Sequence, residues 1–177
     1  SWQKGTESVL NIFNKNELPL TFIQSNKNYD NTDKDKNITY INTFLDVSVL
    51  NDLFNTSSIH LCPSIYEGWG HYLYEALSVG ALVYVTRLPM FLEWLDPELV
   101  VFNDCIYSGR NDDVLFLRKR KNCLHQFGWL VDEECLEDNI NNYKKHLEKH
   151  NPTKVRDYFR YLNDKNSDTL LNHLLDL

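Results

Sequence analysis

Short apolar runs alternate with segments of helical periodicity along the chain up to Leu95. Each run is bounded by polar residues, glycine or proline, as buried strands are. The strands predicted from these runs lie at 20–24 (LTFIQ), 38–41 (ITYI), 59–62 (IHLC) and 82–86 (LVYVT). Helical spacing over about 5–15 precedes the first of these strands, and helical spacing over 72–79 lies between the third and the fourth. The interval between the first two strands is a polar, low-complexity loop from Ser25 to Asn37.

The interval between the second and third strands also has helical spacing, which begins after Asp46. Asp46 is the expected N-cap, and Val47, Leu50 and Phe54 recur at core positions. Strands separated by short helices form βα units, which require right-handed crossovers and a parallel sheet covered on both faces. The pattern therefore predicts an α/β fold with a parallel sheet flanked by helices.

Beyond Leu95 the pattern is less regular. The segment DPELVVF precedes a polar region, and the basic block Arg118–Lys121 reads as a solvated loop. GWLVD at 128–132 predicts a last edge strand, and a helix is expected from about Cys135 to Lys149. Two shorter helices, RDYFRYL and TLLNHLL, would close the chain.

Length and composition fit one folding unit. The 177 residues, 42% of them hydrophobic, suffice for a single core, so we expect one domain over residues 1–177. The formal charge of −7 argues against a nucleic-acid partner, which would require a basic face. No apolar run approaches the roughly eighteen residues of a membrane span. The first residues show no secretory or transit pattern, and the cysteines form no CxxC pair, so reduced thiols and a cytoplasmic location are the simplest reading.

The segment Leu61–Glu75 (LCPSIYEGWGHYLYE) carries the candidate chemistry. A buried strand passes through a loop with Gly68 and Gly70 into a helix, whose unpaired N–H groups favour a phosphate or diphosphate. Glu67 and Glu75 bracket this anion site. Ideal helix geometry would separate them by about 12 Å, so one carboxylate could reach each end of an extended ligand.

This segment resembles the signature of retaining glycosyltransferases with the two-domain GT-B architecture, especially the family 4 group. That signature is Pro-Ser, a short spacer, Glu-Gly-aromatic-Gly and a second Glu eight residues after the first. The matching residues here are Pro63, Ser64, Glu67, Gly68, Trp69, Gly70 and Glu75. The upstream strand order and the opening SWQKGTESVLNIF also resemble the nucleotide-binding domain, so the likeness covers residues 1–95 well and 128–145 weakly.

The resemblance implies a Rossmann-like domain, one half of a GT-B architecture, that binds a nucleoside-diphosphate sugar. Glu67 would be the catalytic carboxylate at the donor sugar, Glu75 would bind the ribose and Lys4 would neutralise the diphosphate. The backbone N–H groups around Gly68, Trp69, Gly70, His71 and Tyr72 would cradle the same region. The nucleotide would be UDP, by family frequency, and the scheme needs no metal and no cofactor.

The same resemblance implies a partner domain. A complete enzyme has an N-terminal acceptor-binding domain, and neither that domain nor the first strand of the nucleotide-binding domain has a counterpart in the sequence, so we expect a fragment of a larger enzyme with an unknown acceptor. Two alternatives stay open: a non-catalytic nucleotide-sugar binding module, and an enzyme similar to GT-B nucleotide-sugar epimerases.

A metal site has weaker support. His146 and His150 have the i, i+4 spacing of metal ligands, yet no acidic ligand motif or third histidine accompanies them. We expect both histidines to be exposed to solvent.

Overall fold

The computed structural model describes residues 4–23, 36–108 and 128–175, with the side chains of Ser108, Gly128 and residues 168–175 left out. The basic block Arg118–Lys121 thus lies outside the described residues. So does most of the predicted polar loop, of which only Lys36 and Asn37 are described. The elements are α1 (Thr6–Lys15), β1 (Leu20–Ile23), β2 (Ile38–Ile41), α2 (Val47–Thr56), β3 (Ile59–Cys62), α3 (His71–Ser78), β4 (Leu82–Thr86), α4 (Pro89–Leu92), β5 (Val100–Asn103), β6 (Cys105–Ser108), β7 (Gly128–Val131), α6 (Glu133–Asn141), α7 (Tyr143–Lys149) and α8 (Pro152–Leu175).

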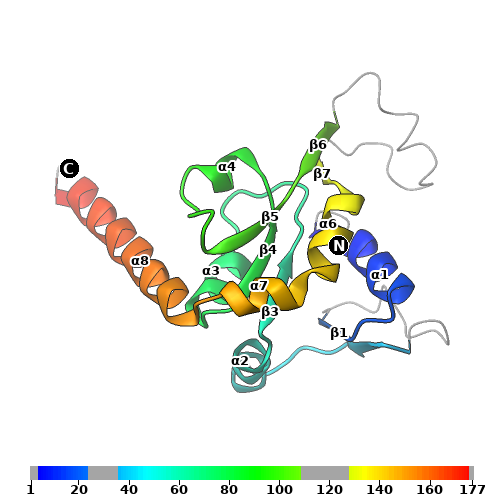
Figure 1. The fold of residues 1–177 in the computed structure, drawn as a ribbon. Coiled ribbons are helices and arrows are strands. Elements are labelled where there is room, and N and C mark those ends of the chain that lie inside the picture. The colour runs from blue at the N-terminus through cyan, green and yellow to red at the C-terminus, as the bar shows by residue number, and fades with distance from the viewer. Residues whose placement is uncertain (1–3, 24–35, 109–127, 176–177) are drawn as a thin grey trace.

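The strands form three sheets in the described part of the chain (Figure 1). β3, β4 and β5 are parallel in that order, with Leu61 opposite Tyr84 and Tyr84 opposite Val101. β1 and β2 form a separate parallel pair, and β6 and β7 an antiparallel one. The predicted α/β class with parallel strands is confirmed, although the parallel strands are divided between two sheets.

β4 is the centre of the molecule, because both of its faces are buried. Val83 and Val85 pack in one cluster with Leu73 and Leu77 of α3, while Leu82 and Tyr84 pack in a second cluster on the opposite face. α8 adds to the first cluster, and α1 and α6 contribute to the second; in Figure 1 these helices lie on opposite sides of β4. Apolar side chains that alternate between two covered faces are the mark of a buried parallel strand.

Three helix predictions need correction. The expected helix from Cys135 to Lys149 breaks at Asn142, whose side-chain Nδ2 donates to the carbonyl of Asp138 at 2.8 Å and so competes with continued helix. RDYFRYL and TLLNHLL belong to the single helix α8. Asn151 precedes this helix, and its Oδ1 accepts hydrogen bonds from the N–H groups of Thr153 and Lys154.

The predicted start of α2 after Asp46 was right, but the predicted burial of its apolar residues was wrong. Asp46 is the N-cap residue, without a side-chain cap hydrogen bond, and no residue of the helix is buried. Val47 is 74% exposed, although it stands at a core spacing. Leu53 and Phe54, by contrast, line a cavity below the helix. The predicted edge strand at 128–132 is present as β7, paired antiparallel to β6.

Candidate functional site

The loop from Pro63 to Gly70 connects the carboxyl end of β3 to α3. Gly70 is the N-cap of α3 in the left-handed conformation, and no side chain in the described part of the chain caps this helix. A Cβ on Gly70 would lie 3.1 Å from the ring of Phe91, so glycine suits both the backbone and the close packing. The N–H groups at the start of α3 are therefore left for a ligand or water.

Lys4 approaches this loop from the other side of the site. Its Nζ forms an ion pair with Oε1 of Glu67 and lies 4.2 Å from the centre of the Tyr72 ring. The Glu67 side chain is 12% exposed and that of Lys4 is 44% exposed. The resemblance implies that Glu67 binds the donor sugar and that Lys4 binds the diphosphate. The structure places these two side chains in contact.

Gly5 fixes the chain beside Lys4. It has a φ of 60°, and a Cβ built there would lie 2.2 Å from the carbonyl oxygen of Pro63. No other residue type fits this position without a backbone shift, because the obstructing atom belongs to the main chain. The close approach of Gly5 to Pro63 holds Lys4 at the mouth of the loop.

Two further residues hold the Glu67 carboxylate. Ser64 donates from Oγ to Oε1 of Glu67 at 2.9 Å, and the Tyr72 hydroxyl donates to Ser64 Oγ at 2.6 Å. Burial is the main cause that raises the pKa of Tyr72 far above its usual value, so its hydroxyl stays protonated and available as a donor. Glu67 therefore has a fixed orientation before any ligand arrives.

Sequence analysis did not assign roles to Ser64 or to the side chain of Tyr72. Ser64 stands three residues before Glu67, a spacing at which a serine hydroxyl reaches a nearby acceptor in a tight loop. That signal was available in the Pro-Ser pair. The contact from Tyr72 was not, because it depends on how α3 packs against the loop.

The remaining predicted residues lie around this cluster without joining it. Glu75 and His71 are exposed on α3, and Gly68 is exposed on the loop, where a Cβ would meet nothing within 4 Å. Trp69 stacks on Tyr74, with ring centres 5.6 Å apart and an angle of 6° between the rings. Tyr74 in turn stacks on Trp94, so half-exposed Trp69 ends an aromatic column.

Cys62, at the end of β3, lies directly below the cluster. Burial raises the pKa of its thiol strongly; the nearby charge of Lys4 acts in the opposite direction, and the carboxylates of Glu67 and Glu75 reinforce the rise. A thiol in this environment stays neutral and behaves as a small apolar side chain.

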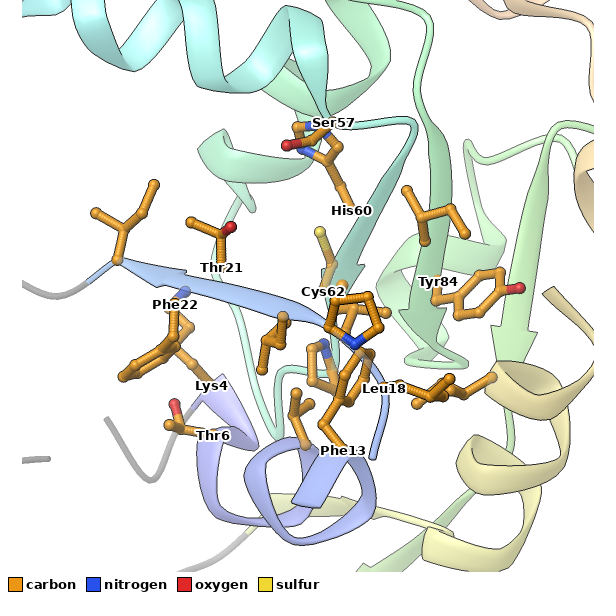
Figure 2. Close-up of a pocket in the computed structure, with 18 of the residues that line it drawn as sticks. Lys4, Thr6, Phe13, Leu18, Thr21, Phe22, Ser57, His60, Cys62 and Tyr84 are labelled. Atoms are coloured by element: carbon orange, nitrogen blue, oxygen red, sulfur yellow. The ribbon is translucent and has the colours of Figure 1, made fainter. Parts of the chain in front are cut away.

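A cavity of about 530 Å³ opens beside the cluster (Figure 2). Its walls come from α1, β1 and β3, with Lys4 and Tyr72 among the lining residues. Figure 2 shows the side chains of Phe13, Leu18, Cys62 and Tyr84 gathered around this hollow. The lining is mainly apolar. Sequence analysis did not predict this cavity.

The structure gives the two histidines intramolecular partners. His146 Nδ1 lies 2.8 Å from the Tyr84 hydroxyl, and His150 Nε2 lies 2.8 Å from the carbonyl oxygen of Gly80. The prediction that both are solvent-exposed was wrong, since both are half-buried. Within residues 4–23, 36–108 and 128–175, no group of three or more His, Cys, Asp or Glu side chains has the arrangement of a metal site.

Comparisons with known proteins identify the fold. No model of a protein family matches the chain, and no curated protein matches its sequence. A solved structure of sucrose-phosphate synthase from Thermosynechococcus elongatus superposes over 99% of this chain, with a TM-score of 0.67 and 13% identity. The C-terminal domain of the glycosyl transferase group 1 family protein LpcC from Francisella tularensis superposes over 91% of it, with a TM-score of 0.51 and 16% identity.

This chain covers a different share of each of the two similar structures. It spans 43% of the synthase chain and 80% of the LpcC domain. The fold is thus that of a GT-B glycosyltransferase C-terminal domain, as the motif at 63–75 predicted. In the described part of the chain no helix is both long and apolar enough to cross a bilayer.

Proposed function

We propose that this chain is the donor-binding domain of a glycosyltransferase and binds a nucleoside-diphosphate sugar at the loop from Pro63 to Gly70. The observation that carries the proposal is the cluster of Lys4, Ser64, Glu67 and Tyr72 beside the uncapped start of α3. It lies at the carboxyl end of β3, where parallel α/β sheets bind their ligands. A glycosyltransferase fold adds support.

The diphosphate would lie between Lys4 and the start of α3. The helix N-terminus offers backbone donors and a partial positive charge, and the Lys4 ammonium adds a full one. The chain as a whole is negatively charged, so attraction of the ligand depends on these local groups. Glu75, exposed on α3, would accept hydrogen bonds from the ribose of the nucleotide, for which UDP is our first choice.

Glu67 would bind hydroxyl groups of the donor sugar. Its ion pair with Lys4 defines the unliganded state, and ligand binding would exchange partners: Lys4 turns to the diphosphate and the freed carboxylate accepts from the sugar. Ser64 keeps its hydrogen bond throughout and so preserves the orientation of Glu67. Such an exchange leaves neither charge without a partner, because the diphosphate pairs with Lys4 while Ser64 and the sugar hydroxyls donate to Glu67.

The chemical step we propose is transfer with retention of anomeric configuration. The bond between the anomeric carbon and the diphosphate oxygen breaks, and the oxygen keeps the electron pair. An acceptor hydroxyl forms the new bond at the same face and loses its proton to the departing phosphate oxygen. Preorganised N–H groups and Lys4 stabilise the charge that develops on the leaving group. The acceptor would be bound by another domain of the whole enzyme.

Isothermal titration with UDP, GDP and ADP sugars tests this proposal. We expect one nucleotide class to bind, and we expect Glu67→Ala and Glu75→Ala each to weaken binding by about tenfold, the worth of one charged hydrogen bond. Glu148→Ala, which removes an exposed helical carboxylate on α7, is the matched control and should leave binding unchanged. A folded chain that binds none of the sugars would overturn the proposal.

A second candidate is a nucleotide-sugar binding module without transfer activity. Both candidates predict binding, so the release of free nucleotide separates them. If the chain slowly hydrolyses the bound sugar nucleotide, and Glu67→Ala abolishes this hydrolysis, a transferase site is favoured. Binding without any release of free nucleotide would favour the binding module.

A further inference from the structure

The loop from Pro63 to Gly70 exposes a large aromatic ring close to Glu67. Trp69 is 51% exposed, and two residues of extended chain span at most about 7 Å, so its Cα lies within that distance of the Cα of Glu67. Tyr66, on the other side of Glu67 in the sequence, is 54% exposed and contacts no ring in the described part of the chain. Trp69 differs from Tyr66 because another ring supports it.

The aromatic column beneath Trp69 fixes the orientation of its ring. The rings of Trp69 and Tyr74 are nearly parallel, with an angle of 6° between them and centres 5.6 Å apart. Tyr74 also stacks on Trp94 at 5.0 Å and meets Phe159 edge-on at 6.3 Å, and both of these residues pack against the core. Because Tyr74 covers one face of the indole, its exposed surface is mainly the opposite face. This flat apolar surface is oriented before a ligand arrives, so binding there costs little side-chain entropy.

The column and the pair of Lys4 with Glu67 lie on different sides of the start of α3. Tyr72 faces the ion pair, since its ring centre lies 4.2 Å from Lys4 Nζ. Tyr74 instead contacts Trp69. Two positions along an α-helix are separated by about 200° around its axis, so these two tyrosines point in nearly opposite directions. A ring that stacks on Trp69 is therefore a second ring, distinct from one whose hydroxyl groups bind Glu67.

The chemistry of this surface fits the apolar face of a sugar ring. The face of an aromatic ring carries partial negative charge, and the C–H groups on one face of a pyranose carry partial positive charge. The indole N–H of Trp69 donates to no group among the described residues, so it is available to a sugar hydroxyl. Glu75 and Glu93, each next in sequence to a member of the column, are exposed and disfavour an anionic ligand. A neutral saccharide satisfies all of these conditions.

We propose that the exposed face of Trp69 binds a sugar ring of the acceptor, and that the acceptor is a neutral saccharide. The acceptor role rests on the proposed function, because it takes the ring bound at Glu67 to be the donor sugar. The short separation of Trp69 and Glu67 along the loop lets one saccharide extend from the indole to that donor. Tyr74 is then a positioning residue, which acts through the orientation of Trp69.

The indole N–H signals of the four tryptophans, in a proton–nitrogen correlation spectrum, test the proposal. The signal that disappears in Trp69→Phe is that of Trp69. We expect at least one of maltose, cellobiose and diacetylchitobiose to move this signal in a saturable way, and to move the other indole signals less.

Two variants locate the binding. Saturation transfer to the disaccharide should show that Trp69→Leu weakens binding at least about tenfold, because the stacking surface is lost. Tyr161→Leu removes a ring of similar exposure from α8, away from the loop, and should leave binding unchanged. The proposal is overturned if no disaccharide moves the Trp69 signal, or if Trp69→Leu binds as well as the unchanged chain.

Titration with UDP and UDP-glucose separates an acceptor ring from a donor ring. We expect UDP-glucose to move the Trp69 signal no further than UDP does, and the disaccharide to move it also when UDP-glucose is bound. A larger change with UDP-glucose than with UDP would assign the ring on Trp69 to the donor and contradict the proposal. A chain that binds the disaccharide but no sugar nucleotide would overturn the acceptor role together with the proposed function. Failure of the disaccharide alone would leave donor binding intact.

Discussion

The two sides of β3 differ in how firmly they are built, and the site draws on both. On one side, β4 and β5 with α3 form a closed core in which Leu73, Leu77, Val83, Val85 and Phe91 are 0% exposed. On the other side, β1 and α2 border a cavity of about 530 Å³. We call these the closed half and the open half.

Each half supplies a different part of the cluster. The closed half carries Ser64, Glu67 and Tyr72 on a loop and helix anchored in the core. The open half supplies Lys4 through α1. The comparison teaches that the carboxylate is positioned by a packed core, whereas the cation that pairs with it comes from the side of the molecule that borders the cavity.

The largest difference between the halves should appear in core substitutions. Leu77→Ala removes a side chain that is 0% exposed and should cost about 3 kcal/mol of unfolding free energy. Leu53→Ala, in the half-buried wall of the cavity, should cost less than about 1.5 kcal/mol, because the space beside it already exists. Urea unfolding of both variants measures this, and equal losses would break the comparison.

Gly5→Ala tests how the open half is tied to the loop. The new methyl group would lie 2.2 Å from the Pro63 carbonyl oxygen in a left-handed backbone, so we expect a loss of about 2 kcal/mol. Because the strain moves Lys4 away from Glu67, binding of a nucleoside diphosphate should weaken as well. Gly68→Ala is the matched control, since a Cβ there meets nothing within 4 Å.

Ser64→Ala should lower the unfolding free energy by less than Gly5→Ala does. It removes the hydrogen bond to Glu67 and deprives the Tyr72 hydroxyl of its acceptor, which should cost about 1–2 kcal/mol of unfolding free energy. We expect the affinity for the sugar nucleotide to fall by more than the affinity for the bare nucleotide. Ser78→Ala, which breaks a 2.7 Å contact to the Glu75 carbonyl, serves as the control. An unchanged preference for the sugar nucleotide would show that Ser64 does not position Glu67.

The smallest effect is a pH dependence that arises in the open half. Burial lowers the pKa of His60, whose side chain lines the cavity. The unfolded chain therefore binds a proton more readily than the folded chain, so stability should be full above about pH 6.5 and should fall as the pH drops from there through the lowered pKa. In His60→Gln, the unfolding free energy measured between about pH 5 and 7 should change less with pH than in the unchanged chain. A slope that is the same in both proteins would assign the effect to other groups, such as His146, whose pKa burial also lowers.

The sequence predicted strands β1 to β4, in both halves, but it predicted neither β5 nor the way in which the open half is covered. Continuous apolar runs defined β3 and β4 correctly, and the helix predicted over 72–79 is present as α3, His71–Ser78. The burial of Val47 was wrong, because periodicity shows which face of a helix is apolar and does not show whether another element covers that face. The cavity was not predicted for the same reason.

The candidate site could be predicted only in part. The motif located Glu67 and the loop glycines, since local spacing fixes where a strand ends and a helix begins. The pairing of Lys4 with Glu67, 63 positions apart, follows from the packing of Gly5 on Pro63 and has no local signal. Likewise, the stacking of Trp69 on Tyr74 depends on how the loop folds back over α3.

The most direct test of the central claim measures, by isothermal titration, the affinities for a sugar nucleotide and for its bare nucleotide, for example UDP-glucose and UDP. The three proteins compared are the unchanged chain, Lys4→Ala and Glu67→Ala. The account predicts that Lys4→Ala weakens both ligands about equally, because both carry the diphosphate. Glu67→Ala should weaken the sugar nucleotide and spare the bare nucleotide, because only the sugar reaches that carboxylate. If Glu67→Ala instead affected both ligands equally, or neither, the assignment of Glu67 to the donor sugar would be wrong.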